Sequence, residues 1–303
     1  MRVAYITDEV YLRHDTGPMH PESPKRLIAI DNALKELKDE LIIAEPLSAS
    51  EEIIAQVHEP QLIETVKEAS AHERAIDPDT VCSRDSFLAA KKAVGAGIVA
   101  VDGVKAGAFE RAFCAVRPPG HHATATNAMG FCLFNNIAIT ARYAQSVGYQ
   151  KVMIIDFDVH HGNGTQGAFW EDDTVFYFSS HQSFAYPGTG AETDIGEGKG
   201  SGFTANFFMM PESGDQELLD IYQNDLPPLV AKFQPDIILV SAGYDLHESD
   251  PLASLNVTTE GIRKMVRRIL SLSNVPYIFF LEGGYQLDAL GENVRVTIEE
   301  MLQ

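Results

Sequence analysis

Six short runs of apolar residues constrain the fold of this chain more than any other feature. Each is rich in β-branched or aromatic side chains, and they occupy residues 2–7, 111–116, 151–156, 174–179, 236–242 and 276–282. Nearly continuous apolar runs of this length are typical of strands that are buried on both faces, as in a parallel sheet. The runs therefore predict a set of buried parallel strands.

Helical patterns with a spacing near 3.6 residues lie between these runs. They cover residues 22–38, 48–57, 84–104, 133–148, 215–232, 258–271 and 288–302, with helix starts expected at Ser23-Pro24 and Thr258-Thr259-Glu260. Strands that alternate with helices predict right-handed βαβ units and one doubly wound α/β sheet. Because no repeat and no long polar linker interrupts the pattern, we expect residues 1–303 to form a single domain.

The cysteines and the N-terminus bear on the cellular compartment. Cys82, Cys114 and Cys132 form no CxxC pair, which argues against a disulfide framework or a cysteine-based zinc site and fits a reducing compartment. The N-terminal apolar stretch is too short for a signal peptide. No stretch approaches the roughly 18 apolar residues of a membrane helix. We therefore expect a cytoplasmic protein that does not use a membrane as partner.

The charge balance limits the partners. The chain has 43 acidic and 23 basic residues, a formal net charge of −20. This argues against nucleic acid, whose phosphates require a basic surface. The charge is compatible with attracting cationic substrates, and equally with a solvated acidic surface that keeps the protein in solution.

The irregular stretches are where chemistry is expected. They cover residues 8–21, 117–132, 157–165, 180–202, 242–257 and 282–287, and most follow a predicted strand directly. In open parallel sheets, ligands bind outside the carboxyl ends of the strands. Functional side chains should therefore lie in these loops.

A metal site is the strongest chemical signal. Asp158 and His160 follow a predicted strand and are two residues apart, so they face the same side of an extended chain. Asp245, a few residues beyond another strand, is placed to supply a third ligand. Two Asp and one His leave an open position, as in catalytic zinc sites, where bound water is activated. The oxygen-rich set also tolerates Fe²⁺. Alternatively, these are ordinary polar loop residues.

Two further loops carry candidate catalytic groups. His121 and His122 follow a strand and are suited to acid–base work beside a metal-bound water. Tyr285, after Gly283-Gly284, can stabilise an oxyanion with its hydroxyl group. The alternatives are a structural histidine in the pair and a tyrosine that simply belongs to the core.

Together these segments resemble the zinc-dependent histone deacetylase and acetylpolyamine amidohydrolase superfamily. The resemblance rests on residues 117–122, 156–166, 241–252 and 281–285 in this order, with 130–136 and 20–22, and it extends over essentially the whole chain. It implies an arginase-like α/β fold with a central eight-stranded parallel sheet and helices on both faces.

The resemblance also implies roles for individual residues. Zinc would be held by Asp158, His160 and Asp245, while Tyr285 and the metal polarise the amide carbonyl. Other residues would form the substrate channel, its rim and a structural potassium site. The channel and rim residues are Gly130, Phe131, Tyr186 and Asp79, and the potassium ligands are Asp156, Asp158, His160, Ser179 and Ser180.

One departure from the class I pattern bears on the histidine pair. The position that is Asp in class I enzymes is Asn163 here, as in class II members. An aspartate partner stabilises imidazolium, so His121 with Asp156 should stay charged. His122 beside the neutral Asn163 should stay neutral. We therefore expect His122 to act as the base and His121 as the proton donor.

The substrate is expected to be acetylated lysine in a protein or peptide. Polyamine-selective relatives carry a glutamate where this chain has Leu252, and bacterial acetylpolyamine enzymes carry a longer insertion before residue 84. The alternative is an acetylated polyamine or another small amide, which the acidic charge favours. A non-catalytic acyl-lysine reader and an arginase-type hydrolase are further alternatives. The intact ligand set argues against the reader, and the lack of a two-metal carboxylate set against the arginase. The sequence leaves the oligomeric state open.

Overall fold

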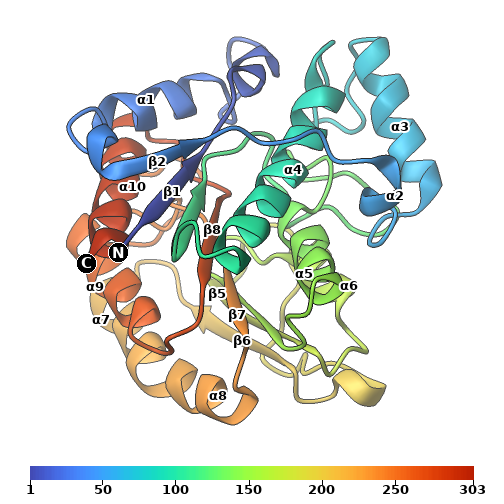
Figure 1. Cartoon of the computed structure of the whole chain (residues 1–303). Helices are drawn as coiled ribbons and strands as arrows, with labels where there is room; N and C mark the ends of the chain where they lie inside the picture. The colour runs from blue at the N-terminus through green and yellow to red at the C-terminus, as the bar shows by residue number, and fades with distance from the viewer.

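One eight-stranded parallel sheet organises the protein (Figure 1). The computed structural model describes residues 1–303. The strand order is β2-β1-β3-β8-β7-β4-β5-β6, and every neighbouring pair is parallel. The strands are β1 (Val3–Ile6), β2 (Leu41–Ala44), β3 (Arg111–Cys114), β4 (Val152–Asp156), β5 (Val175–Gln182), β6 (Thr204–Met209), β7 (Ile237–Ala242) and β8 (Tyr277–Leu281).

Helices cover both faces of the sheet (Figure 1). One layer contains α1 (Lys25–Ala33), α7 (Asp215–Asp220), α8 (Leu226–Phe233), α9 (Thr259–Leu270) and α10 (Leu287–Leu302). The other contains α2 (Glu51–Ile54), α3 (Pro60–Ala71), α4 (Ser86–Lys105), α5 (Asn136–Ser146) and α6 (Asn163–Ala168). The two termini lie side by side, since the N-terminal ammonium donates to the carbonyl of Leu302. The doubly wound α/β sheet expected from the sequence is confirmed.

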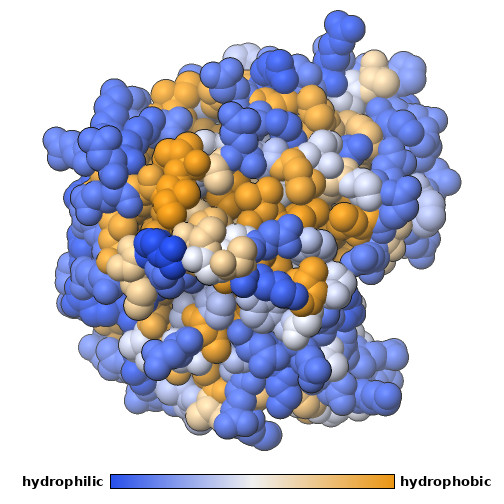
Figure 2. All heavy atoms as spheres, in the orientation of Figure 1, coloured by the Kyte–Doolittle hydropathy of each residue, from blue (hydrophilic) through white to orange (hydrophobic).

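The central strands are the ones that the apolar runs predict. Every residue of β1, β4, β7 and β8 is buried, because helices cover these strands on both sides. The edge strands β2 and β6 are only partly buried and do not stand out in the sequence. On β2, Ile42 and Ile43 are exposed, and Figure 2 shows hydrophobic residues gathered on this part of the surface.

Several helices differ from the sequence expectation in extent. The helix expected over 22–38 is α1 alone, followed by a turn at Leu34. The helix expected over 48–57 shortens to α2, which Ser50 caps by accepting from the Ile53 amide. A π-helical turn, Ile221–Asp225, separates α7 from α8. The expected start of α9 is confirmed, because the Thr258 hydroxyl accepts from the Gly261 amide.

A buried charge network ties the N-terminal loop to the centre of the sheet. Glu22, Arg26 and Arg117 have no solvent-exposed side-chain surface. Arg117 donates through two of its nitrogens to the Glu22 carboxylate, and Arg26 Nη1 donates to Glu22 Oε1 at 3.3 Å. Burial opposes ionisation of Glu22, but Arg117, then His14 and Arg26, lower its pKa to about 2. The carboxylate is therefore ionised and fully paired.

Replacing Glu22 by Gln should destabilise the fold by about 3–5 kcal/mol, because it leaves two buried guanidinium groups without their carboxylate. The depressed pKa means that the contribution of Glu22 is complete above the usual value of 4.5 and is lost as the pH falls towards 2. Urea unfolding at several pH values measures both effects. Glu110→Gln, which breaks an exposed pair with Arg2, is the control and should change stability little. A Glu22→Gln variant as stable as the control would contradict this account.

Candidate active site

Four adjacent strands deliver the candidate catalytic residues to one place. The central strand order β3-β8-β7-β4 brings the loops after these strands together at the carboxyl edge of the sheet. A cavity of about 650 Å³ opens there. Ten of the residues singled out from the sequence line it: His121, His122, Asp158, His160, Tyr285, Gly130, Phe131, Tyr186, Asp79 and Leu252.

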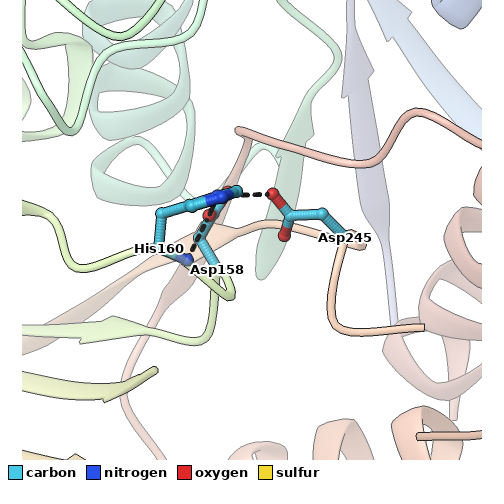
Figure 3. A group of neighbouring side chains, drawn as sticks. All are labelled: Asp158, His160 and Asp245. Carbon is cyan, nitrogen blue, oxygen red and sulfur yellow. Dashed lines mark hydrogen bonds and ion pairs between the residues drawn. The ribbon is translucent and has the colours of Figure 1, made fainter. Parts of the chain in front are cut away.

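Asp158, His160 and Asp245 point toward one another and form the candidate metal centre (Figure 3). His160 Nδ1 lies 3.2 Å from Asp158 Oδ1 and 3.1 Å from Asp245 Oδ2. A tetrahedral ion with bonds near 2.1 Å separates its ligand atoms by roughly 3.4 Å. The donor types and their spacing therefore fit one divalent ion. Both carboxylates are buried, whereas His160 keeps a side-chain exposure of 13% towards the cavity.

Main-chain groups hold the two carboxylates in place. Asp158 Oδ2 accepts from the Gly283 amide at 2.7 Å, and Asp245 Oδ1 accepts from the Val159 amide at 3.0 Å. A Cβ atom at Gly283 would lie 2.1 Å from Asp245 Oδ2, and one at Gly243 would lie 2.1 Å from Asp158 Oδ2. Glycine is required at both positions because the main chain passes directly against the ligand oxygens.

The charges of this group favour a cation. Burial and the neighbouring Asp158 raise the pKa of Asp245 to about 7. The shift arises because two adjacent buried carboxylates repel each other when both are ionised. Burial alone would lower the pKa of His160, but hydrogen bonds to Asp158 and Asp245 raise it to about 11. A divalent ion would supply the positive charge that the proton on His160 otherwise provides.

The two cavity histidines have different partners and opposite pKa shifts. His121 Nδ1 lies 3.1 Å from Asp156 Oδ2, and His122 Nδ1 lies 2.9 Å from Asn163 Oδ1. Burial opposes the charge on His121, but Asp156, Asp158 and Glu282 raise its pKa to about 10. Burial and the nearby His121 lower the pKa of His122 well below its usual value. The His121 ring therefore has the higher affinity for a proton and the His122 ring the lower.

The Tyr285 loop is fixed from two sides. Arg26 donates to the carbonyls of Gly284 at 2.7 Å and Glu282 at 2.5 Å, and its guanidinium lies 5.1 Å from the Tyr285 ring centre. Asp250 accepts from the Tyr285 amide at 2.6 Å and from the next amide along. Asp250 belongs to the loop that carries Asp245, so the third metal ligand and the tyrosine share one support.

Glu282 is a site residue that the sequence pattern does not single out. It is completely buried, and its Oε2 accepts from the amides of Gly120 at 2.7 Å and His121 at 3.2 Å. Burial raises its pKa to about 7 although His121 works in the opposite direction. The only sequence signal for a role of Glu282 is its position, directly after β8 and three residues before Tyr285.

The remaining cavity residues form its walls and mouth. The Phe131 ring lies 5.9 Å from that of Tyr285, and the Tyr186 ring lies 5.1 Å from that of His122. Leu252 is exposed at the mouth. The main-chain carbonyl of Asp79 accepts from His20 Nε2 at 3.0 Å, which fastens the rim.

Of the residues proposed for potassium, Asp158 and His160 line the cavity, whereas Asp156, Ser179 and Ser180 are buried outside its lining. Asp156 of β4 is in register with Ser179 of β5. The Ser179 hydroxyl is bonded to His181 Nδ1 at 2.9 Å, and the Ser180 hydroxyl to Tyr222 at 2.9 Å. Each hydroxyl oxygen keeps lone pairs that are available to a cation, as are those of the main-chain carbonyls.

Known proteins share this architecture. Residues 20–301 match the family described as the histone deacetylase domain. The chain belongs to the histone deacetylase family. It is 41% identical to histone deacetylase 10, chloroplastic, of rice (Oryza sativa subsp. japonica), over 93% of this chain and 70% of the relative. It is 36% identical to a probable deacetylase of Archaeoglobus fulgidus, over 95% of this chain and 82% of the relative.

The three-dimensional likeness is close. The crystal structure of the HDA15 HD domain superposes with a TM-score of 0.96 at 33% identity, covering 99% of this chain and 88% of that one. The fold is therefore the arginase-like fold of the histone deacetylases, as expected, and the protein is a deacetylase and hence a hydrolase. No helix combines the length and the apolar character that crossing a membrane requires.

Replacing Gly283 by Ala should weaken metal binding by about 10- to 100-fold, because the new methyl group would collide with Asp245 Oδ2. Titration of metal-free protein with Zn²⁺ against a competing chelator measures the affinity. Gly167→Ala is the matched control, since a Cβ atom there meets nothing within 4 Å. Equal affinity in the two variants would contradict the assignment of this metal centre.

Proposed function

We propose that this protein is a zinc-dependent amidohydrolase that removes acetyl or related acyl groups from lysine side chains of proteins or peptides. The observation that carries the proposal is the convergence of Asp158, His160 and Asp245 on one point of a cavity that the histidine pair and Tyr285 also line. We infer that residues 1–303 act as one deacetylase domain. Zn²⁺ fits the two-oxygen, one-nitrogen ligand set, and Fe²⁺ is the alternative.

A divalent ion at this centre would supply Lewis-acid activation of the amide carbonyl and of a water molecule. His122 is neutral and accepts the proton that the attacking water loses. Tyr285 donates a hydrogen bond from its hydroxyl to the carbonyl oxygen as negative charge develops there. His121, held as an imidazolium by Asp156, donates a proton to the departing amine nitrogen. The products are a carboxylate and the free amine.

The neighbouring residues would orient the base, enclose the substrate and bind a second ion. Asn163 accepts from the His122 ring and so orients the base. Gly130, Phe131 and Tyr186 enclose the alkyl chain of the acylated lysine, and Asp79 accepts hydrogen bonds from the substrate main chain. A potassium ion beside β4 and β5 would be held by oxygens of Asp156, Asp158, His160, Ser179 and Ser180, and would offset buried negative charge.

The mouth of the cavity bears on the substrate. Leu252 presents an apolar side chain where a carboxylate would attract a second ammonium group of a polyamine. This favours acetylated lysine in a peptide, while the net charge of −20 favours cationic small molecules. Acetylpolyamine deacetylation is therefore the second candidate. The cytoplasmic location expected from the sequence stays a prediction, and the rice relative's name places that protein in the chloroplast.

Side-by-side kinetics on acetyl-lysine peptides and acetylated polyamines with zinc-loaded enzyme tests the substrate class. We expect kcat/KM for peptides to exceed that for polyamines by at least about tenfold, and a chelator to abolish both activities. A preference for polyamines would establish the second candidate instead. Binding of peptide without turnover, with zinc present, would indicate a reader.

Replacing Tyr285 by Phe should lower kcat by about 10²–10³-fold, because the carbonyl oxygen loses its hydrogen-bond donor in the transition state. Zinc content, measured by atomic emission, should stay at the wild-type level since Tyr285 does not belong to the metal centre. Tyr149→Phe, a phenol remote from the cavity, serves as the control. Wild-type turnover in Tyr285→Phe would remove this hydroxyl from the mechanism.

A further inference from the structure

We propose that a second hollow beside the mouth of the active-site cavity binds an apolar side chain of the peptide next to the acylated lysine. We call it the side groove: it has a volume of about 530 Å³, and its apolar walls are Phe184, Tyr186, Phe208 and Met210. The inference rests on the proposed peptide deacylation and deepens it, because it names a feature of the substrate sequence.

The side groove adjoins the active-site cavity. Tyr186 lines both hollows, so one aromatic ring separates them. Gln182, another lining residue, accepts from the Ser254 amide at 2.7 Å, two residues from Leu252 at the cavity mouth. A peptide whose acyl-lysine enters the cavity would therefore have a neighbouring side chain within reach of the side groove.

The walls of the side groove expose hydrophobic surface to solvent. Phe184 is 92% exposed and Met210 is 58% exposed, and Phe208 beside them is exposed as well. Phe184 also has a φ of 61°, a left-handed conformation that is strained for a bulky side chain. Phe131, in the wall of the active-site cavity, shares this trait with a φ of 69°. Strain of this kind is concentrated at ligand-binding positions.

The two histidines that line the side groove have protein partners at every ring nitrogen. His161 is bonded to Thr189 Oγ1 at 2.8 Å and to Gln166 Oε1 at 2.9 Å. His181 is bonded to Ser179 Oγ at 2.9 Å and to the Gly190 carbonyl at 3.1 Å. With all four ring nitrogens occupied, these histidines present only carbon to the groove. The two histidines are therefore not available as metal ligands or acid–base groups in this groove, which fits an apolar occupant.

The side groove distinguishes the two candidate substrate classes. An acetylated polyamine is an unbranched, cationic chain and has no side chain to place on Phe184 or Met210. A peptide with leucine or phenylalanine beside the acyl-lysine buries apolar surface there, which is favourable in proportion to the area removed from water. The exposed aromatic wall thus supports peptides over polyamines as substrates.

Matched acetyl-lysine peptides test this inference. One member of each pair carries Leu and the other Gly at one flanking position, before or after the acyl-lysine. We expect kcat/KM to favour the Leu peptide by about tenfold at one of the two positions, as burial of part of a leucine side chain predicts. The variant Phe184→Gly with Met210→Ser should reduce this ratio to near one.

Glycine adopts a positive φ without strain, so the substitution at position 184 should not prevent folding, and the Tm should stay unchanged. Ile43→Ser is the matched control: it removes an exposed hydrophobic residue from β2, at the opposite edge of the sheet from β6, and should keep the tenfold ratio.

Three results would overturn the inference: equal kcat/KM for both members of every pair in the wild type, a ratio that survives in the double variant, or a concentration-dependent dimer that the double variant abolishes. The third result would mean that a second copy of the chain covers the groove. Failure of the proposed function looks different, since no peptide would then be hydrolysed while acetylated polyamines are.

Discussion

Four carboxyl groups buried side by side at the carboxyl ends of the central strands are the constraint on which the rest of the structure depends. Asp156, Asp158, Asp245 and Glu282 are almost completely shielded from water, and no lysine or arginine forms an ion pair with any of them. Unpaired charge in such a place is very unfavourable. The protein balances it with main-chain amides, with the imidazolium of His121, and in our account with a divalent ion.

This balance explains how the loops are arranged. The Gly283 and Val159 amides point at the carboxylates of Asp158 and Asp245, and two glycines keep the main chain close enough to do so. Arg26 lies on the far side of the Tyr285 loop and does not belong to the metal centre. It holds the loop by donating hydrogen bonds to the carbonyls of Gly284 and Glu282. Arg26 and Arg117 thus bond to Glu22 and to main-chain oxygens and not to the metal ligands. The position between the metal ligands is left for an ion.

The sequence predicts the parts of the fold that local patterns determine. Fully buried strands produce continuous apolar runs, so the central strands are recognisable, whereas the half-exposed edge strands β2 and β6 are not. Helix α3, which begins with Pro60, is not among the helices expected from the sequence, although its apolar residues have helical spacing. The extent of α1 depends on the turn at Leu34, which no residue in the sequence marks clearly.

The candidate site divides in the same way. Asp158 and His160 are close in sequence, and a two-residue spacing is enough to predict that they act together. Asp250 and Glu282 work through amides of residues far along the chain, and such partners leave no local pattern. Phe184 is similar, because neither its exposure nor its backbone conformation can be read from the sequence around it.

The central claim is that Asp158, His160 and Asp245 hold one catalytic divalent ion. Anomalous diffraction from crystals of the metal-loaded protein, recorded on both sides of the zinc absorption edge, tests it most directly. We predict a single strong zinc peak about 2.0–2.2 Å from one carboxylate oxygen of each aspartate and from the imidazole Nδ1. A catalytically active protein whose crystals show no anomalous peak between these three side chains would contradict the account.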